Sequence, residues 1–131
     1  MAFTFFFRDK HTLDLIQDHV IPVVSARRYI RIWDAGCANG SEPYSLAILI
    51  RENMGHFLFR NVNILASDIN ENFGNIIRDG IYSWEEVGRI PKDILDKYFV
   101  PDQSKSDKYI LSKEIKNSVD FLHHDLLSFV P

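Results

Sequence analysis

The residues most able to do chemistry stand in positions 30–45. They are, in order, Gly36, Gly40 and Glu42. Branched and aromatic residues before Asp34 predict a strand, and the residues after Gly40 predict the start of a helix. A strand, a glycine turn and a helix start together hold a nucleotide-like ligand at the carboxyl end of a parallel sheet. Both glycines can adopt a positive φ and let a ligand approach the backbone, which a Cβ would hinder.

The spacing of the two glycines restricts the class of ligand. The pattern Asp34-x-Gly36-x-x-x-Gly40 differs from G-x-G-x-x-G, the fingerprint of a pyrophosphate-binding turn, and no P-loop lysine follows it. A nucleoside that carries an amino acid fits this loop better than a dinucleotide or a nucleoside triphosphate. Two glycines after a strand are weak evidence alone, and an ordinary strand-to-helix turn explains them at least as well. The helix is expected to begin with Ser41 or Glu42 as its N-cap.

A second acidic residue stands at the end of a second predicted strand. Residues 62–68 form an apolar run that ends in Asp68, as expected of a parallel strand covered on both faces. An acid at the carboxyl end of such a strand can accept hydrogen bonds from a ribose diol. It can also cap the helix that follows, and both roles can coexist.

The rest of the sequence predicts the elements that would position these residues. They are a helix over 11–26 that Pro22 kinks or divides, a buried helix over 43–54 capped by Gly55, a short helix over 70–79 that contains Gly74, an irregular region over 82–116 with a strand at 109–111, and a strand over 117–122. The two histidines that follow the last strand, His123 and His124, are adjacent and have no companion cluster, so no metal site is predicted.

Composition and charge exclude several classes of protein. The 131 residues suit one domain, and the net charge of −3 gives no general attraction to nucleic acid or an anionic membrane. No apolar run reaches transmembrane length, and residues 1–7 lack the basic leader and cleavage site of a signal peptide. Cys37 is the single cysteine, so no internal disulfide can form. A cytoplasmic location is the default expectation.

The stretch from Trp33 to Ser45, with its Glu-Pro-Tyr-Ser run at 42–45, resembles the chemotaxis receptor methyltransferase (CheR-type) family. That family uses S-adenosylmethionine to methylate glutamates of receptor proteins. The resemblance extends over most of the chain. The matching segments are Thr4, Phe6, Phe7 and Arg8 of a Thr-x-Phe-Phe-Arg element, Ala66-Ser67-Asp68-Ile69, Gly80-Ile81-Tyr82 and Tyr98-Phe99.

The resemblance implies an α/β, Rossmann-like methyltransferase fold with about three parallel strands and flanking helices. The chain covers about the first half of the family's catalytic domain, so residues 1–131 are expected to form a partial S-adenosylmethionine-binding domain. Residues 81–116 correspond to an inserted irregular and β-rich subregion that helps receptor docking in the family, although an ordinary surface excursion explains this region equally well. The strand over 30–35 would lie at an exposed edge of the sheet. Either the segment from Phe3 to Phe7 folds across this edge, or a second copy of the chain pairs with it as a homodimer.

The resemblance also assigns roles to particular residues. Arg8 would lie beside the reactive methyl group as the catalytic residue, and the expected cofactor-binding residues are Thr4, Arg8, Gly36, Glu42, Asp68, Asp125 and Leu126. Gly36 would pass under the amino acid part of the cofactor, and Glu42 would meet its ammonium group. Asp68 would hold the ribose. Asp125 and Leu126 would flank the adenine.

The expected function is therefore S-adenosylmethionine-dependent methylation of glutamate side chains in the cytoplasmic region of chemoreceptors. Because the chain matches only the first half of the family's domain, it is expected to be truncated, with low or no activity alone. The alternative is a non-catalytic regulatory or binding module that retains half a cofactor site. Neither nucleic acid nor membrane insertion is expected.

Overall fold

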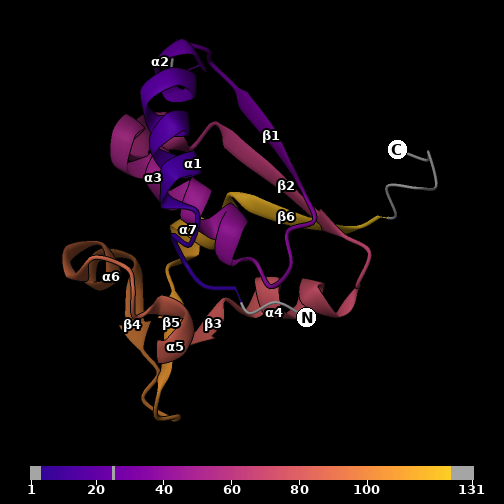
Figure 1. Ribbon diagram of the computed structural model, residues 1–131, viewed down its shortest axis with the longest axis vertical. Helices are drawn as coiled ribbons and strands as arrows, with labels where there is room; N and C mark the ends of the chain where they lie inside the picture. The colour runs from indigo at the N-terminus through magenta and orange to yellow at the C-terminus, as the bar shows by residue number, and fades with distance from the viewer. Residues whose placement is uncertain (1–3, 25, 125–131) are drawn as a thin grey trace.

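The computed structural model describes residues 4–24 and 26–124, and these residues form two three-stranded sheets with flanking helices (Figure 1). The helices are α1 (Lys10–Leu15), the π-helical turn η1 (Ile16–Val20), α2 (Ile21–Val24), α3 (Ser41–Phe59), α4 (Asn72–Asp79), α5 (Trp84–Val87), α6 (Lys92–Tyr98) and α7 (Lys113–Asn117). The strands are β1 (Ile30–Ala35), β2 (Val62–Asp68), β3 (Ile81–Ser83), β4 (Phe99–Pro101), β5 (Lys108–Leu111) and β6 (Val119–His123).

The larger sheet is parallel, with strand order β1-β2-β6. Ala35 of β1 lies opposite Ser67 of β2, so both strands end at the same edge of the sheet. The predicted α/β architecture with three parallel strands is confirmed. Among the described strands β1 pairs with β2 alone, so it occupies the edge position that the sequence predicted.

The two faces of this sheet differ in burial. Ile30, Ile64 and Ala66 point to the face that packs against α3 and are buried, as their apolar side chains require. Trp33 points to the opposite face and is 56% exposed. Its indole N–H donates to Ser67 Oγ at 2.8 Å, which fixes the ring across the sheet.

The smaller sheet is antiparallel, with strand order β3-β5-β4, and it lies within residues 81–111. Phe6 joins it to the N-terminal segment. The Phe6 side chain is fully buried and makes edge-to-face contacts with Tyr82 at 4.9 Å and Phe99 at 5.3 Å between ring centroids. The Phe6 N–H also donates to the carbonyl of Glu86 at 2.9 Å. The aromatic start of the chain is therefore anchored on this sheet.

Several boundaries differ from the sequence prediction, among them the ends of α3 at Ser41 and Phe59 and the start of α4 at Asn72. The expected helix over 11–26 is divided into three pieces, because the π-helical turn η1 separates α1 from α2 just before Pro22. Proline has no N–H to donate to the carbonyl four residues earlier, which favours an altered turn here. The third strand begins at Val119, not at Asn117, because Asn117 ends α7.

Gly74 lies inside α4, where alanine would be the better helix former. A Cβ at this position would come within 2.8 Å of the Phe121 ring on β6. The glycine therefore allows α4 to pack closely against the sheet. Helical geometry in α3 is interrupted at Gly55, whose φ is 82°, as the predicted cap indicated.

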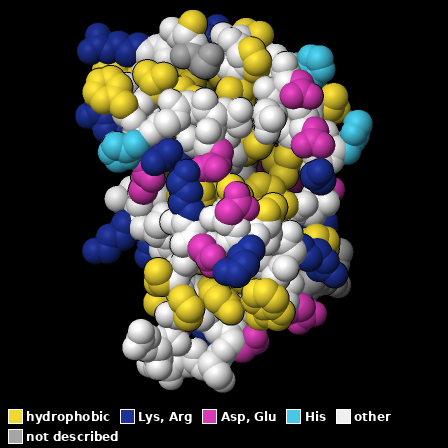
Figure 2. Space-filling model, turned by 90° about the vertical axis from the view of Figure 1, so that its left-hand side faces the viewer, with side chains coloured by type: hydrophobic (Ala, Val, Ile, Leu, Met, Phe, Trp, Pro, Cys, Tyr) yellow, Lys and Arg dark blue, Asp and Glu magenta, His cyan; other side chains and the backbone are white. Residues whose placement is uncertain are grey.

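The surface mixes charge types. On the face shown in Figure 2, acidic and basic side chains intermingle across the middle, and apolar side chains gather in a band below them. No helix within residues 4–24 and 26–124 has the length and apolar character needed to cross a bilayer.

Candidate functional site

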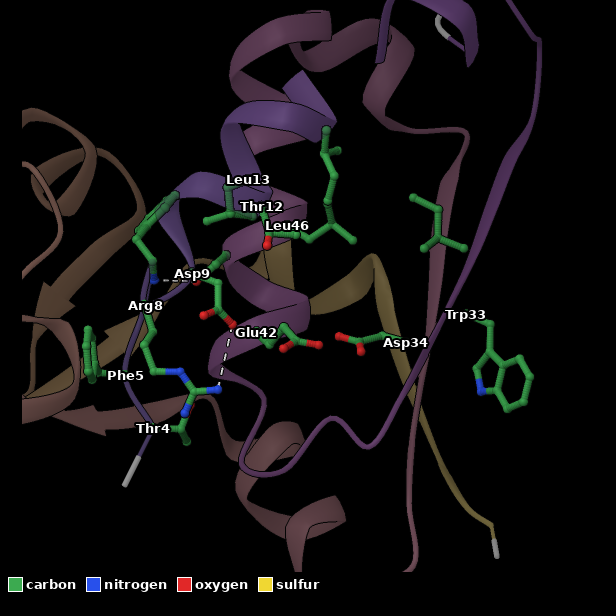
Figure 3. A pocket seen from close by; sticks show the side chains of 14 residues that line it. Thr4, Phe5, Arg8, Asp9, Thr12, Leu13, Trp33, Asp34, Glu42 and Leu46 are labelled. Atoms are coloured by element: carbon green, nitrogen blue, oxygen red, sulfur yellow. Dashed lines mark hydrogen bonds and ion pairs between the residues drawn. The ribbon is translucent and has the colours of Figure 1, made fainter. Parts of the chain in front are cut away.

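A cavity of about 320 Å³ lies between the N-terminal segment, β1 and the start of α3 (Figure 3). Its lining residues are Thr4, Phe5, Phe7, Arg8, Asp9, Thr12, Leu13, Ile16, Ile32, Trp33, Asp34, Glu42, Ser45 and Leu46. Apolar side chains from α1 and β1 form much of the wall, and charged groups from three segments enter it. We name this cavity the β1–α3 pocket.

Asp34 and Glu42 bring two carboxyl groups together inside the β1–α3 pocket. Asp34 lies near the end of β1, and Glu42 lies in the first turn of α3, so the two side chains face each other across the turn (Figure 3). Burial, and after it the neighbouring Glu42 carboxyl group, raise the pKa of Asp34 to about 8. The Oδ2 atom of Asp34 is buried and has no hydrogen-bond partner among the described residues.

The same carboxylates act on Cys37. Burial, followed by the charges of Asp34 and Asp68, raises the pKa of the Cys37 thiol to about 12. A thiol that stays protonated at neutral pH is a poor nucleophile, so Cys37 is a packing residue of the loop.

The loop between β1 and α3 is held against β2. The N–H groups of Gly36 and Cys37 both donate to the Ser67 carbonyl, at 2.7 and 2.9 Å. Gly36 has a φ of +75°, and a Cβ built there would meet nothing within 4 Å. Open space at a left-handed glycine is what close approach of a ligand to the backbone requires.

Gly40 differs from the expectation that both glycines face a ligand. Its φ is +97°, but a Cβ there would come within 2.7 Å of both Ile77 Cγ1 and the Tyr82 hydroxyl. The space at Gly40 is filled by the protein itself. Gly40 is also the N-cap of α3, in place of the predicted Ser41 or Glu42, and the Asn39 side chain accepts the Ser41 N–H at 3.0 Å.

Asp68 holds the same loop from the end of β2. Its Oδ2 accepts the N–H of Ala38 at 3.1 Å, and its Oδ1 accepts the N–H of Asn70 at 3.0 Å. The second bond closes a turn that precedes α4. The N-cap of α4 is Glu71, so Asp68 does not have the helix-capping role that the sequence had allowed. Each carboxylate oxygen has a second lone pair, so Asp68 can still accept hydrogen bonds from a ligand.

The N-terminal segment is fixed to α3 by two serines. Thr4 Oγ1 lies 2.9 Å from Ser41 Oγ, and the Phe7 N–H donates to Ser45 Oγ at 2.9 Å. These contacts place Arg8 at the mouth of the β1–α3 pocket, with its guanidinium 3.7 Å from the Asp9 carboxylate. The Arg8 side chain is 40% exposed, which suits contact with an incoming group.

The structure brings some of the predicted site residues together and separates others. Thr4, Arg8 and Glu42 line the β1–α3 pocket. Gly36 and Asp68 lie beside it, on the loop and at the end of β2, and do not line that cavity. Asp125 and Leu126, the expected adenine contacts, lie outside the described residues.

Two contributors to the site were not predicted. Asp34 stands near the carboxyl end of a strand, as Asp68 does, so the argument used for Asp68 could have found it. Asn39 fixes the loop to the second sheet, because its amide donates to Glu86 Oε2 at 2.6 Å and its carbonyl accepts the Tyr82 hydroxyl at 2.8 Å. Its partners are more than forty positions away, and no local sequence signal points to them.

The residues present fit a cationic nucleoside that carries an amino acid. Two facing carboxyl groups with one unpartnered buried oxygen suit an ammonium group, which has three donors and no acceptor. The open side of Gly36 leaves room for the ligand to pass the backbone, and Asp68 offers free lone pairs next to it. Within residues 4–24 and 26–124, no three His, Cys, Asp or Glu side chains gather as a metal site.

Comparison with known proteins identifies relatives of this chain. Residues 2–131 match the family model described as CheR methyltransferase, SAM binding domain. A chemotaxis protein methyltransferase of Borreliella burgdorferi is 34% identical over an alignment that covers 95% of this chain and 46% of that protein.

Two further relatives agree with this match. Chemotaxis protein methyltransferase 2 of Pseudomonas aeruginosa is 32% identical over 95% of this chain and 44% of its own length. The chemotaxis protein methyltransferase of Escherichia coli is 33% identical over 95% of this chain and 43% of its own length. The chain thus spans slightly less than half the length of the curated relatives it matches.

Proposed function

Because the chain belongs to the CheR methyltransferase family, through its S-adenosylmethionine-binding domain, we propose that it binds S-adenosylmethionine at the β1–α3 pocket and serves in methylating glutamate side chains of chemoreceptors. The convergence of Arg8, Asp34 and Glu42 from three separate segments on one cavity carries this proposal. The cofactor of this family is S-adenosylmethionine. The relatives are named as chemotaxis protein methyltransferases, which supports a receptor substrate.

The proposed cofactor contacts follow the geometry of the loop. Glu42 would accept the ammonium group of the cofactor's amino acid, and Gly36 would let that part pass the backbone. Asp68 would accept the ribose hydroxyls with the lone pairs that its two backbone donors leave free. Thr4, held by Ser41, would form part of the opposite wall.

The chemistry asked of the chain is modest. When bound, S-adenosylmethionine supplies a methyl group on a sulfonium centre. A glutamate carboxylate is already a nucleophile at pH 7, so no general base is needed, and the protein contributes positioning and exclusion of water. Arg8 would hold the incoming carboxylate by a bidentate contact at the pocket mouth, and the apolar wall of Leu13 and Leu46 would keep water out.

The partner implied by this function is the cytoplasmic region of a chemoreceptor, and the chain would act in the cytoplasm.

We also propose that β1 pairs with a second copy of the chain as a two-fold dimer. Arg31 is the only charge in β1 before Asp34, and strand edges are ordinarily protected by charge, proline or a covering element. Phe6 anchors the N-terminal segment on the second sheet, not along β1, which favours a second copy at this edge. Light scattering should show mass increasing with concentration, and a monomer at every concentration would reject the dimer.

Calorimetric titration with S-adenosylhomocysteine tests the proposed function. The wild-type chain should bind, and Asp68→Ala should weaken binding by about 1.5–3 kcal/mol through lost charge-assisted hydrogen bonds. The control is Asp96→Ala, which removes an exposed carboxylate on α6 that pairs with Lys92. Thermal unfolding of both variants separates lost contacts from lost loop support, because Asp68 also holds Ala38. Absence of binding by the wild-type chain would contradict the proposal.

A methyl-transfer assay separates the two candidate roles. With labelled S-adenosylmethionine and a receptor cytoplasmic fragment, turnover that is lost in Arg8→Ala would support an enzyme in its own right. Binding without turnover would favour the regulatory or binding module instead.

A further inference from the structure

The facing carboxyl groups of Asp34 and Glu42 are a feature that cofactor binding by Glu42 alone does not explain. Both side chains enter the β1–α3 pocket, and their carboxyl groups face each other there. Two ionised carboxylates that face each other repel, so in the absence of a cation one of them favours the protonated form. The second oxygen of Asp34 is buried without a partner among the described residues. The pair is therefore poised either to share a proton or to accept a cation.

The surroundings of the pair favour a bound proton in the free protein. Burial and the neighbouring Glu42 raise the pKa of Asp34 to about 8. From the N-terminal segment and α1, the charged groups that enter this pocket are Arg8 and Asp9, which form an ion pair with each other at 3.7 Å.

We propose that Asp34 holds one proton against the Glu42 carboxyl group in the free protein, and that this proton is released to solvent when the ammonium group of S-adenosylmethionine binds between the two side chains. This inference rests on the proposed function. The ammonium group brings one positive charge and three donors, so it replaces the proton in both charge and hydrogen bonding. Asp34 is then a second anchor for the amino acid part of the cofactor, and its buried oxygen gains a partner.

The proposal makes cofactor affinity depend on pH in a defined way. One proton leaves the protein for each ligand bound. Affinity should therefore rise about tenfold for each unit of increasing pH up to about pH 8, and then level off. The chain would bind its cofactor less tightly in an acidified cell. A ligand without an ammonium group should show none of this dependence.

Calorimetry in two buffers of different ionisation enthalpy measures the released proton directly. At pH 7, S-adenosylhomocysteine should release close to one proton from the wild-type chain. Asp34→Asn keeps the shape of the side chain and cannot ionise, so its complex should release none. The ligand control is 5′-methylthioadenosine, which has the nucleoside and the thioether but no amino acid. It should bind the wild-type chain without proton release.

Circular dichroism and thermal unfolding establish that Asp34→Asn is folded before its binding is compared. Equal proton release by the wild-type chain and the variant would overturn the proposal, as would proton release on binding of 5′-methylthioadenosine. If Asp34→Asn does not fold, the affinity of the wild-type chain for S-adenosylhomocysteine and for 5′-methylthioadenosine is measured against pH. The same pH dependence for both ligands would overturn the proposal. If neither nucleoside binds the wild-type chain at any pH, the proposed function itself fails.

Discussion

The two glycines of the β1–α3 loop should respond differently to the same substitution. In Gly40→Ala, the new Cβ meets Ile77 and the Tyr82 hydroxyl at 2.7 Å, so one of them must move. A Cβ at a left-handed φ costs about 1–2 kcal/mol. Displacing the Tyr82 hydroxyl from the Asn39 carbonyl leaves buried polar groups unpaired, at about 1–3 kcal/mol. The sum, about 2–5 kcal/mol, is a large share of the 5–15 kcal/mol that stabilises a typical domain.

Gly36→Ala is the matched control. Its φ of +75° imposes a similar backbone cost, but the new Cβ meets nothing within 4 Å, so the loss of stability should stay at about 1–2 kcal/mol. For cofactor binding, Gly36→Ala should be the variant with the direct effect. Gly36→Ala places a methyl group in the space proposed for the ligand, so it should weaken S-adenosylhomocysteine binding while the fold remains.

Urea unfolding of the wild-type chain, Gly36→Ala and Gly40→Ala, followed by tryptophan fluorescence, measures how much each substitution lowers the free energy of unfolding. Calorimetry on the folded variants then measures binding. If Gly40→Ala is no more destabilising than Gly36→Ala, the contacts of the new Cβ with Ile77 and Tyr82 do not explain the need for glycine at position 40. If Gly36→Ala binds S-adenosylhomocysteine as tightly as the wild-type chain, the ligand does not occupy the open space at Gly36.

Two further predictions concern stability. Phe6→Ala should lower the free energy of unfolding by about 3–5 kcal/mol in urea titrations, because it empties a fully buried site between Tyr82 and Phe99, and a loss below 1 kcal/mol would contradict the anchoring role. Asp34 has a folded pKa of about 8, above the ordinary value near 3.9 of the unfolded chain, so its stabilisation is complete below about pH 4 and is lost as pH rises through 8. Asp34→Asn should therefore gain stability relative to the wild-type chain as pH rises from 5 to 9, and a constant difference across that range would refute the raised pKa.

Local sequence determined the order and type of the main elements. The runs at 30–35 and 62–68 indicated parallel strands, because strand preference, flanking turns and the following helices all agree. Gly36 was recognisable as a left-handed turn residue from its place after a strand. Glu42 and Arg8 were identified through the family resemblance, and the structure brings both to one pocket.

Contacts between distant parts of the chain decided the rest. Gly40 and Gly36 look alike in sequence, but Ile77 and Tyr82, from another part of the fold, fill the space at Gly40 alone. Gly74 costs helix stability locally and is explained by the Phe121 ring, forty-seven positions later.

The carboxyl pair shows the same limit at the site. The sequence gives two acids eight positions apart, Asp34 and Glu42, and nothing local says that they meet. The turn at 36–40 must first be held, by Ser67 on one side and by Tyr82 on the other, before β1 and α3 aim these side chains at each other. Burial then raises the pKa of Asp34, because a charge that water would solvate must be neutralised or paired inside the protein. Sequence thus determined which residues were available, and tertiary packing determined which of them share an environment.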